Sequence, residues 1–354
     1  MNGPGSPGGT GAPPEFSVLV AAYNQAEWVV DTLDSVAAQA FGDWELVVVD
    51  DGSTDGTAEA VRGWMDRLRA ARPAVRAVLS SIPNAGQSGA MEHGFGLCRG
   101  RWIALLDSDD RWVPEKLARV AQAAAADPAA GMIVHTMYVI DEHGRRTGDV
   151  RPRRAALSEG DLRDQIRRTT RHVAPATSAV AIRADVFAGL LPMPTKGFRT
   201  AADAYLTMGA SLLAPVKAVH EPLAEYRMHP DGNHIRTMLS PDGVRRWVEL
   251  QSVMARHFGL TGVADRNSYF LRHVFALQKF EGGVGGQVAT FGRLARATWT
   301  DAAFGPGEKL VFSAFWTACL LAPRPVFRRL WRAFQLKQTG FDKIGLRSTA
   351  DSAI

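Results

Sequence analysis

The stretch Arg101-Trp-Ile-Ala-Leu-Leu-Asp-Ser-Asp-Asp-Arg-Trp112 joins a short apolar run to three carboxylates. Ile103 to Leu106 have the length of a buried strand, which stops at Asp107, Asp109 and Asp110. Carboxylates crowded at the end of a buried strand repel one another unless a cation lies among them. Hard oxygen ligands of this kind suit Mg²⁺ or Mn²⁺, usually shared with a phosphate-bearing substrate. A solvated acidic turn is the alternative for this stretch taken alone.

The chain before this stretch alternates between strands and helices. Apolar runs of strand length lie at residues 16–22, 45–49 and 75–79, and helical spacing of apolar residues follows each of them. Continuous apolar strands separated by helices predict an α/β fold with a mostly parallel sheet covered on both faces. Ligands bind at the carboxyl ends of such strands. We therefore expect Tyr23-Asn24, Asp50-Asp51-Gly52-Ser53 and the Asp107 cluster to face one crevice.

The second half of the chain is expected to extend this domain and then to become helical. Strands are predicted at residues 132–140, 179–183 and 216–226, and helices at residues 114–126, 244–258 and 269–280. This pattern predicts a disordered tail over residues 1–14, an α/β domain over residues 15–235 and a helical region over residues 236–354.

Composition and motif searches exclude several classes. The 354 residues carry a net charge of +5, with 46% hydrophobic and 22% charged residues, which is typical of a globular protein and does not indicate a nucleic-acid partner. Cys98 and Cys319 form no disulfide framework or metal-ligand spacing, and a cytoplasmic location is expected. No signal peptide, 18-residue apolar run, GxGxxG after the first strand, P-loop or EF-hand is present.

Two basic segments each leave two interpretations open. The arginine-rich residues 145–171 form either a solvated surface or a site for an anionic acceptor or lipid. Residues 310–322 are apolar but too short to span a bilayer, and residues 323–340 interleave Trp, Phe and Leu with arginines. This second pattern predicts peripheral membrane contact through residues 310–340, on the inner face of the cell membrane. The alternative is a helix docked on the protein itself or on a partner chain, and a homo-oligomer is compatible with the sequence.

An ordered set of motifs resembles family 2 glycosyltransferases with the GT-A fold. The set comprises Ala22-Tyr23-Asn24, Val49-Asp50-Asp51-Gly52-Ser53-Thr54-Asp55, Asn84-Ala85-Gly86, Leu106-Asp107-Ser108-Asp109-Asp110 and Tyr226-Arg227-Met228-His229. The resemblance covers roughly residues 15 to 235. It implies an inverting transferase that moves a sugar from a nucleotide-diphosphate donor, most often a UDP-sugar, to a glycan or lipid-linked acceptor with Mg²⁺ or Mn²⁺. It also implies a nucleotide-sugar-binding half at residues 15–112 and an acceptor half at residues 113–235.

The resemblance assigns roles to individual residues. Asp203 would be the catalytic base, Asp109 and Asp107 would hold the metal, and Asp107 would also approach the ribose. The remaining donor-site residues are Ala22, Tyr23, Asn24, Asp51, Asn84, Gly86, Ser108 and His229. A separate base agrees with the chemistry, because direct displacement needs one carboxylate to take the acceptor proton, while a divalent ion stabilises the departing diphosphate.

The sequence also departs from the family pattern. Ala202 precedes Asp203 where the family commonly has Glu, Glu92 replaces a common Asn, and Asp110 adds a third carboxylate that either binds metal through water or faces Arg111. These departures leave a catalytically degenerate nucleotide-sugar or glycan binding module as one alternative. A nucleotidylyltransferase is a weaker alternative, because no glycine-rich basic loop follows the first strand.

Each assigned residue has a plain structural alternative. Asp51 could only cap the Gly52-Ser53 turn, and Asp203 could only be an acid favoured at a helix N-terminus. His229 could be an ordinary turn residue before Pro230, and Tyr23 could pack in the crevice wall.

Overall fold

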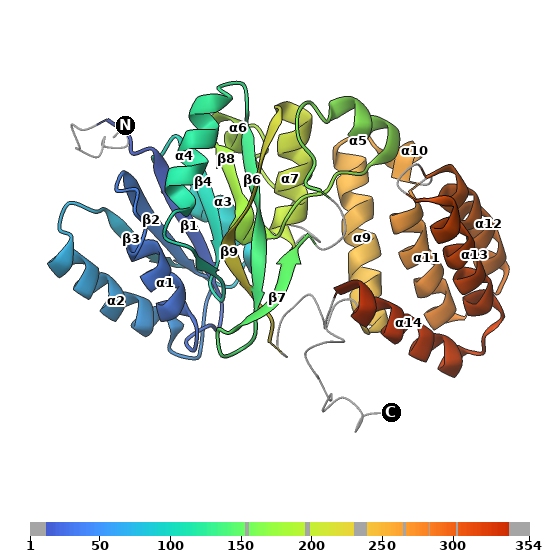
Figure 1. The fold of residues 1–354 in the computed structure, drawn as a ribbon. Helices are drawn as coiled ribbons and strands as arrows, with labels where there is room; N and C mark the ends of the chain where they lie inside the picture. The colour runs from blue at the N-terminus through green and yellow to red at the C-terminus, as the bar shows by residue number, and fades with distance from the viewer. Residues whose placement is uncertain are drawn as a thin grey trace, which may run out of the picture.

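The computed structural model describes residues 12–152, 156–194, 199–229, 239–264, 267–282, 284–301 and 304–339. Residues 1–11 of the expected tail and residues 340–354 lie outside this set. The described chain forms an α/β body at the N-terminal side and a group of helices at the C-terminal side (Figure 1). No helix in the described part is both long and apolar enough to cross a membrane.

The first half of the body alternates strands with helices. Its elements are β1 (Phe16–Ala22), α1 (Val29–Ala37), β2 (Trp44–Asp50), α2 (Thr57–Ala71), β3 (Ala77–Ser81), α3 (Gly86–Phe95) and β4 (Trp102–Asp107). Strands β1 to β4 pair in parallel, with β1 between β2 and β4. Every residue of β2 is buried, as expected for a strand covered on both faces.

The second half of the body mixes strand directions. Its elements are β5 (Arg111–Trp112), α4 (Lys116–Ala126), β6 (Met132–Ile140), β7 (Arg146–Arg151), α5 (Arg163–Thr169), the 3₁₀ turn η1 (Thr177–Ala179), β8 (Val180–Arg183), α6 (Ala184–Ala188), α7 (Ala202–Leu213) and β9 (Val216–Arg227). Strand β8 is antiparallel to both β4 and β6, whereas β6 and β9 are parallel. Among the described residues, the strands form one sheet in the order β3-β2-β1-β4-β8-β6-β9-β5, with β7 beside β6.

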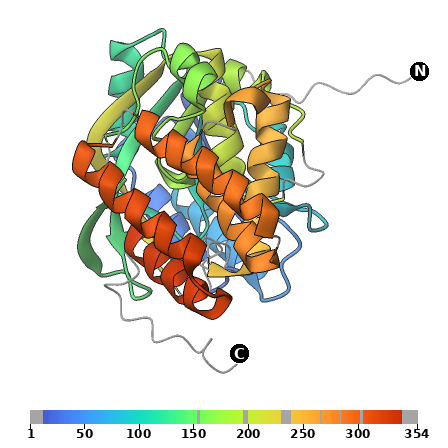
Figure 2. The ribbon, with the colours of Figure 1, turned by 90° about the vertical axis from the view of Figure 1, so that its right-hand side faces the viewer.

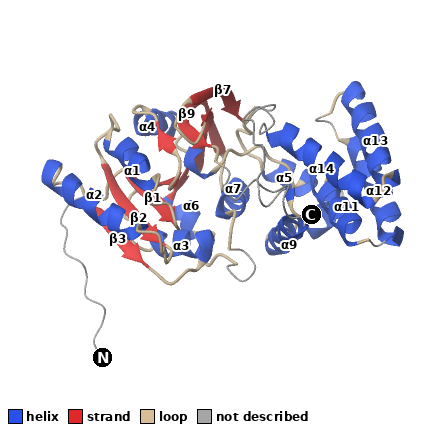
Figure 3. Cartoon of the chain, turned by 90° about the horizontal axis from the view of Figure 1, so that it is seen from below, coloured by secondary structure: helices blue, strands red, loops and turns tan. Residues whose placement is uncertain are grey.

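Helices cover both faces of this sheet (Figure 3). Val18 and Val20 of β1 pack with α1, α2 and α4 on one face. Leu19 points to the other face, where it packs with α3, α6 and α7. Alternate residues of one strand therefore enter two separate cores, as the two-residue period of a strand requires.

The C-terminal helices form a third core. They are α9 (Pro241–His257), α10 (Thr261–Ala264), α11 (Ser268–Glu281), α12 (Val284–Thr300), α13 (Pro306–Leu321) and α14 (Arg324–Thr339), seen face-on in Figure 2. Phe275, Trp316, Phe327 and Trp331 fill this core. Helix α9 sends Val244 into this core and Leu250 and Met254 into the sheet core, so both parts share it. The predicted boundary at residues 235–236 lies outside the described residues.

These findings confirm the predicted α/β fold with C-terminal helices. The expected strand at 132–140 has the predicted limits, and the one at 75–79 begins two residues later and ends at Ser81. The antiparallel direction of β8 was not predicted, because hydrophobic periodicity identifies a strand without giving its direction.

The structure distinguishes the two interpretations of the aromatic and basic residues in α14. Phe327 and Trp331 are 0% and 1% exposed and pack on the protein's own helices. The alternative of a helix docked on the protein itself is therefore correct for this aromatic face. The prediction that these side chains enter a membrane is wrong, because a basic amphipathic sequence suits a bundle edge as well as a bilayer surface.

Candidate active site

The carboxyl ends of three neighbouring strands meet at one edge of the sheet. Residues Ala22 and Asp50 are partners in the β1–β2 register, and Ala21 and Asp107 are partners in the β1–β4 register. The polar groups after β1, β2 and β4 consequently start at the same level. The three segments predicted to face one crevice are brought together by this register.

Asp51 holds the loop between β3 and α3. Its two carboxylate oxygens accept hydrogen bonds from the backbone N–H groups of Ala85, at 2.6 Å, and Gly86, at 2.8 Å. Asn84 Nδ2 donates to the Asp51 carbonyl at 3.0 Å. The alternative that Asp51 only caps the Gly52-Ser53 turn is wrong. Asp50 accepts from Ser53 N in that turn, whereas Asp51 caps the start of α3.

The Gly86 position requires glycine. Its φ of +80° lies in the left-handed region, and a Cβ there would lie 2.5 Å from the Arg199 carbonyl oxygen. The close approach brings the segment before α7 against the start of α3. Arg199 also donates to the carbonyl of Asn84 at 2.9 Å.

The segment after β1 lies beside the segment after β2. Ala22 is buried, whereas Tyr23 is 49% exposed. Asn24 adopts a φ of +51° and is tied to the segment after β2, since its N–H donates to Ser53 Oγ and its Oδ1 accepts from Thr54 N. This bonding orders the wall beside Tyr23 and leaves the Tyr23 side chain accessible to a ligand.

Asp107 sits at the end of β4 among other acids. Its Oδ1 accepts from Gln87 Nε2 at 3.0 Å, and its N–H donates to Ser178 Oγ at 3.0 Å. Burial and the nearby carboxylates of Asp109, Asp110 and Asp203 hold the pKa of Asp107 well above its usual range. Such crowding favours a cation, because a positive charge would relieve the repulsion.

Asp109 pairs with His229. The distance from Asp109 Oδ2 to His229 Nε2 is 3.1 Å, and the rings of His229 and Trp28 lie 4.3 Å apart between centroids. His229 is only 5% exposed, and its Nδ1 has no hydrogen-bond partner among the described residues. The structure therefore brings His229 to the acidic cluster from the far end of β9.

Asp110 does not face Arg111, whose guanidinium contacts Glu225, Asp31 and the Gly144 carbonyl, so that interpretation is wrong. Metal binding by Asp110 through water stays a prediction. One carboxylate oxygen accepts from Ser178 Oγ at 2.6 Å and the other from Arg227 N at 2.8 Å. Burial is the main cause that raises the pKa of Asp110 to about 8. This carboxylate joins β4, η1 and β9, and its oxygens are already used by the protein.

Asp203 lies in the first turn of α7, across the crevice from β4. Burial raises the pKa of its carboxyl group. Its charge in turn raises the pKa of Asp107, so the two groups are electrostatic neighbours. The residue before the helix, Ala201, has a φ of +60°, and the N–H of Ala202 donates to Gln87 Oε1 at 3.1 Å.

The donor set fits a hard divalent cation in part. Asp107 and Asp109 offer carboxylates two residues apart, and Asp109 has a side chain 23% exposed. No group of three His, Cys, Asp or Glu side chains in the described part is arranged to hold a metal ion. Two carboxylates with phosphate oxygens and water would complete a site of the kind that Mg²⁺ prefers. Ser108 is buried, and its carbonyl accepts from Thr32 Oγ1 at 3.0 Å.

Several residues of this site were not predicted. Gln87, Ser178 and Arg227 connect the acidic cluster to α7, η1 and β9. Lys116 is fully buried beneath them, where its Nζ donates to the Ser178 carbonyl at 2.9 Å. Burial also lowers the pKa of Lys116. No local motif marks Gln87, Ser178 or Lys116, because their partners lie far away in sequence. Arg227 belongs to the motif Tyr226-Arg227-Met228-His229, but no role was predicted for it.

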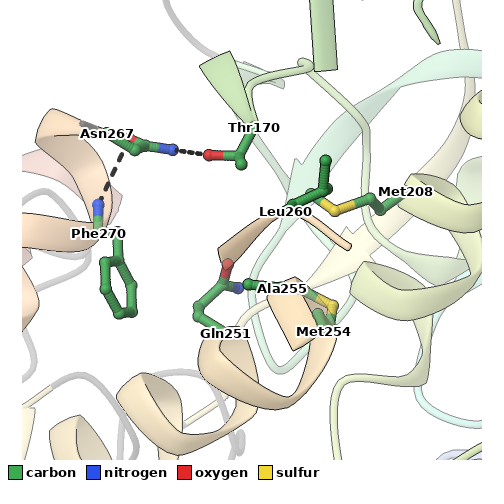
Figure 4. A pocket seen from close by; sticks show the side chains of 8 residues that line it. All are labelled: Thr170, Met208, Gln251, Met254, Ala255, Leu260, Asn267 and Phe270. Atoms are coloured by element: carbon green, nitrogen blue, oxygen red, sulfur yellow. Dashed lines mark hydrogen bonds between the residues drawn. The ribbon is translucent and has the colours of Figure 1, made fainter. Parts of the chain in front are cut away.

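Glu92, which departs from the family pattern, has a structural role. Its carboxylate accepts from the N–H of Met193 at 3.0 Å. This bond ties α3 to the segment that leads towards α7. A small hollow lies elsewhere, where Met208 of α7, Met254 of α9 and Phe270 of α11 are among the lining residues (Figure 4).

Comparison with known proteins agrees with this geometry. Residues 17–187 match the family described as glycosyl transferase family 2. An uncharacterized glycosyltransferase of Nostoc sp. is 31% identical over 222 residues, 62% of this chain and 67% of that protein. The succinoglycan biosynthesis protein ExoO of Rhizobium meliloti is 30% identical over 268 residues, 72% of this chain and 71% of that protein.

Two solved structures share the fold. The crystal structure of S. aureus TarS 1-349 in complex with UDP-GlcNAc matches with a TM-score of 0.56 at 18% identity, covering 92% of each chain. The mannosyltransferase PcManGT from Pyrobaculum calidifontis, in complex with GDP-Man and Mn²⁺, matches with a TM-score of 0.53 at 17% identity. It covers 95% of this chain and 88% of that one.

Proposed function

The chain belongs to glycosyl transferase family 2, and we propose that it is an inverting, metal-dependent enzyme that uses a nucleoside-diphosphate sugar. The acceptor in this proposal is a glycan or a lipid-linked saccharide. One observation carries it: Asp51, Asp107 and Asp109, at the carboxyl ends of two strands, lie at the same edge of the sheet as Asp203. The likeness to proteins that bind UDP-GlcNAc, or GDP-Man with Mn²⁺, supports a sugar-nucleotide donor.

The donor would occupy the edge formed by β1, β2 and β4, in the half at residues 15–112. Ala22, Tyr23 and Asp51 would contact the base, and Tyr23 has the exposed ring that stacking requires. Asn24, Asn84, Gly86 and Ser108 would shape this site through their backbone. Asp107 and Asp109 would hold Mg²⁺ or Mn²⁺, and His229 would lie near the diphosphate. The metal, when bound, stabilises negative charge on the departing diphosphate.

Asp203 would act as the base on the acceptor side, in the half at residues 113–235. The acceptor hydroxyl oxygen forms a bond to the anomeric carbon while the bond from that carbon to the diphosphate oxygen breaks. The hydroxyl proton passes to the Asp203 carboxylate. A carboxyl group whose pKa is raised by burial holds that proton more readily than an exposed one.

A donor panel tests this proposal directly. Thermal unfolding is measured with UDP-, GDP- and TDP-sugars, each with and without Mn²⁺. One donor should raise the melting temperature only when Mn²⁺ is present, and Asp109→Asn should abolish that shift. Asp66→Asn, an exposed acid on α2, is the matched control. A shift unchanged in Asp109→Asn would contradict the metal assignment, and donor binding without transfer or donor hydrolysis would favour the binding-module alternative.

We also propose that the helical region contacts an anionic membrane, but through α13 and not through the aromatic face of α14. On α13, Leu310, Val311 and Leu321 are 60%, 69% and 78% exposed. Arg328 and Arg329 of the following helix are exposed as well. Exposed apolar side chains and exposed basic side chains together suit the boundary between headgroups and acyl chains.

A further inference from the structure

Gln87 uses both ends of its side-chain amide to join two parts of the crevice. Its Nε2 donates to Asp107 Oδ1 at 3.0 Å, and its Oε1 accepts from the N–H of Ala202 at 3.1 Å. Asp107 ends β4, and Ala202 begins α7. The side chain therefore spans the distance between the acidic end of a strand and the first turn of the opposite helix.

The identity of both partners determines the orientation of this amide. A backbone N–H can only donate, so the Ala202 N–H must meet the amide oxygen, which leaves the NH₂ group to donate to Asp107 Oδ1. The reverse orientation would place oxygen against oxygen and N–H against N–H. Gln carries this donor and acceptor on one carboxamide group.

The start of α7 depends on this contact. No side chain at the N-cap position, Ala201, accepts a hydrogen bond, and Ala201 itself is in the left-handed region at φ +60°. The first N–H groups of a helix lack partners within the helix. Gln87 supplies one partner from α3. That helix is in turn held in place by the bonds of Asp51 to Ala85 and Gly86.

We infer that Gln87 is a positioning residue that sets the placement of Asp203 relative to Asp107. The inference rests on the proposed function, because it takes Asp203 as the base and Asp107 as part of the donor site. One amide then links the group that receives the proton to the group that faces the leaving diphosphate. An error of about 1 Å in such an arrangement can lower a rate by about 100-fold.

Substitution of Gln87 separates the two contacts. Gln87→Met removes both bonds at similar volume, and Gln87→Glu keeps an acceptor for Ala202 but loses the donor to Asp107. Gln122→Met, at an exposed glutamine of α4, is the matched control. The turnover number for transfer should fall at least 10-fold in Gln87→Met. The donor dissociation constant should change less than about threefold. Gln87→Glu should instead weaken donor binding, because it adds negative charge beside Asp107.

A double variant and an activity-independent measurement complete the test. If Gln87 acts through the base, Gln87→Met should add little to the loss caused by Asp203→Asn. Losses that multiply in the double variant would overturn the inference. Amide hydrogen exchange at residues 202–206 should accelerate in Gln87→Met and not in Gln122→Met. Unchanged exchange in Gln87→Met would overturn the inference even if no donor were found. Faster exchange in Gln87→Met, together with a wild-type protein that shows no transferase activity, would refute only the proposed function.

Discussion

The aspartates of the candidate site differ in the hydrogen-bond partners of their carboxylates, and these partners indicate the role of each. Both oxygens of Asp110 accept hydrogen bonds from the protein, which fits a structural role. Each Asp51 oxygen accepts one backbone N–H, so the proposed contact with a base would be made beside these bonds. Asp109 has one oxygen near His229, and Asp107 has one oxygen near Gln87, so each retains capacity for a ligand. The Asp203 carboxylate accepts a hydrogen bond from the N–H of Ala204 at 2.8 Å. All five residues carry the same carboxylate group, so their different roles follow from their surroundings.

Replacement of Asp203 tests the residue with the most available carboxylate. Asp203→Asn keeps the size and the helix start but cannot take a proton. The turnover number should fall about 100-fold or more, while the donor dissociation constant measured by calorimetry with Mn²⁺ stays close to that of the wild type. Asp185→Asn, at an exposed acid in the first turn of α6, is a control. Wild-type turnover in Asp203→Asn would refute the base assignment.

His172 makes the stability of the protein depend on pH. Burial lowers its pKa to about 4, and in an unfolded chain the value is about 6.5. As the pH falls from about 6.5 towards 4, the unfolded chain takes up a proton that the folded protein excludes, so stability present above this window is lost. The slope of the unfolding free energy against pH between pH 6 and 5 measures the protons taken up on unfolding, and His172→Gln should reduce this uptake by about one proton. Urea unfolding across this range measures it.

The control for His172 is a histidine that meets water in the folded and the unfolded chain. His143 in the turn after β6 has a side chain 66% exposed. His143→Gln should leave the slope close to that of the wild type. Equal slopes in His172→Gln and the wild type would show that burial of His172 does not contribute.

Local pattern predicted where the acidic residues gather but not which way each one points. The apolar run of β4 and the following aspartates are adjacent in sequence, so the strand end and its charge could be read directly. The inward turn of Asp110 depends on Ser178 and Arg227, which are 68 and 117 residues away. Gln87 was missed for the same reason, since Ala202 is 115 residues distant. Contacts of this range are created by the sheet order, which hydrophobic periodicity does not specify.

At the scale of elements, α3 packs so closely on the sheet at Gly94 that no larger side chain fits there without a shift. A Cβ on Gly94 would lie 2.4 Å from Leu19 Cδ1 and 2.9 Å from Val49 Cγ2. The same helix begins with Gly86 against Arg199. This close packing keeps Gln87 within reach of β4 and α7, so the position of α3 as a whole supports the crevice.

Two glycine substitutions in helices should have opposite effects. Gly94→Ala should destabilise the protein by about 1–3 kcal/mol, because the added methyl group overlaps Leu19 and Val49. Gly63→Ala in α2, where a Cβ meets nothing within 4 Å, should stabilise it by about 0.5–1 kcal/mol. Urea unfolding of both variants measures the difference. Equal effects of the two substitutions would contradict close packing of α3.

In the whole molecule, the C-terminal helices are joined to the body by packing and polar contacts. Arg171 pairs with Asp301, and Asn267 Nδ2 donates to Thr170 Oγ1 at 2.7 Å. Lys279 Nζ donates to the carbonyls of Leu320 and Ala322, which closes the end of α13. The helices therefore form a bundle beside the body, and part of α13 is exposed. The amphipathic pattern of residues 310–340 could not distinguish this bundle edge from a membrane helix, since both bury one apolar face.

The exposed stripe of α13 makes a prediction about lipid binding by the whole protein. Flotation with vesicles of phosphatidylglycerol and phosphatidylcholine should carry the protein upward, and binding should weaken as salt rises from 0.05 to about 0.5 M, because part of the attraction is electrostatic. Leu310→Ser with Val311→Ser and Leu321→Ser should abolish flotation. The same change at Leu213 of α7, which is 50% exposed, should leave flotation intact. Arg328→Glu with Arg329→Glu should weaken flotation at low salt only. Absence of flotation in the wild-type protein, or equal loss in Leu213→Ser, would exclude α13 as a membrane contact.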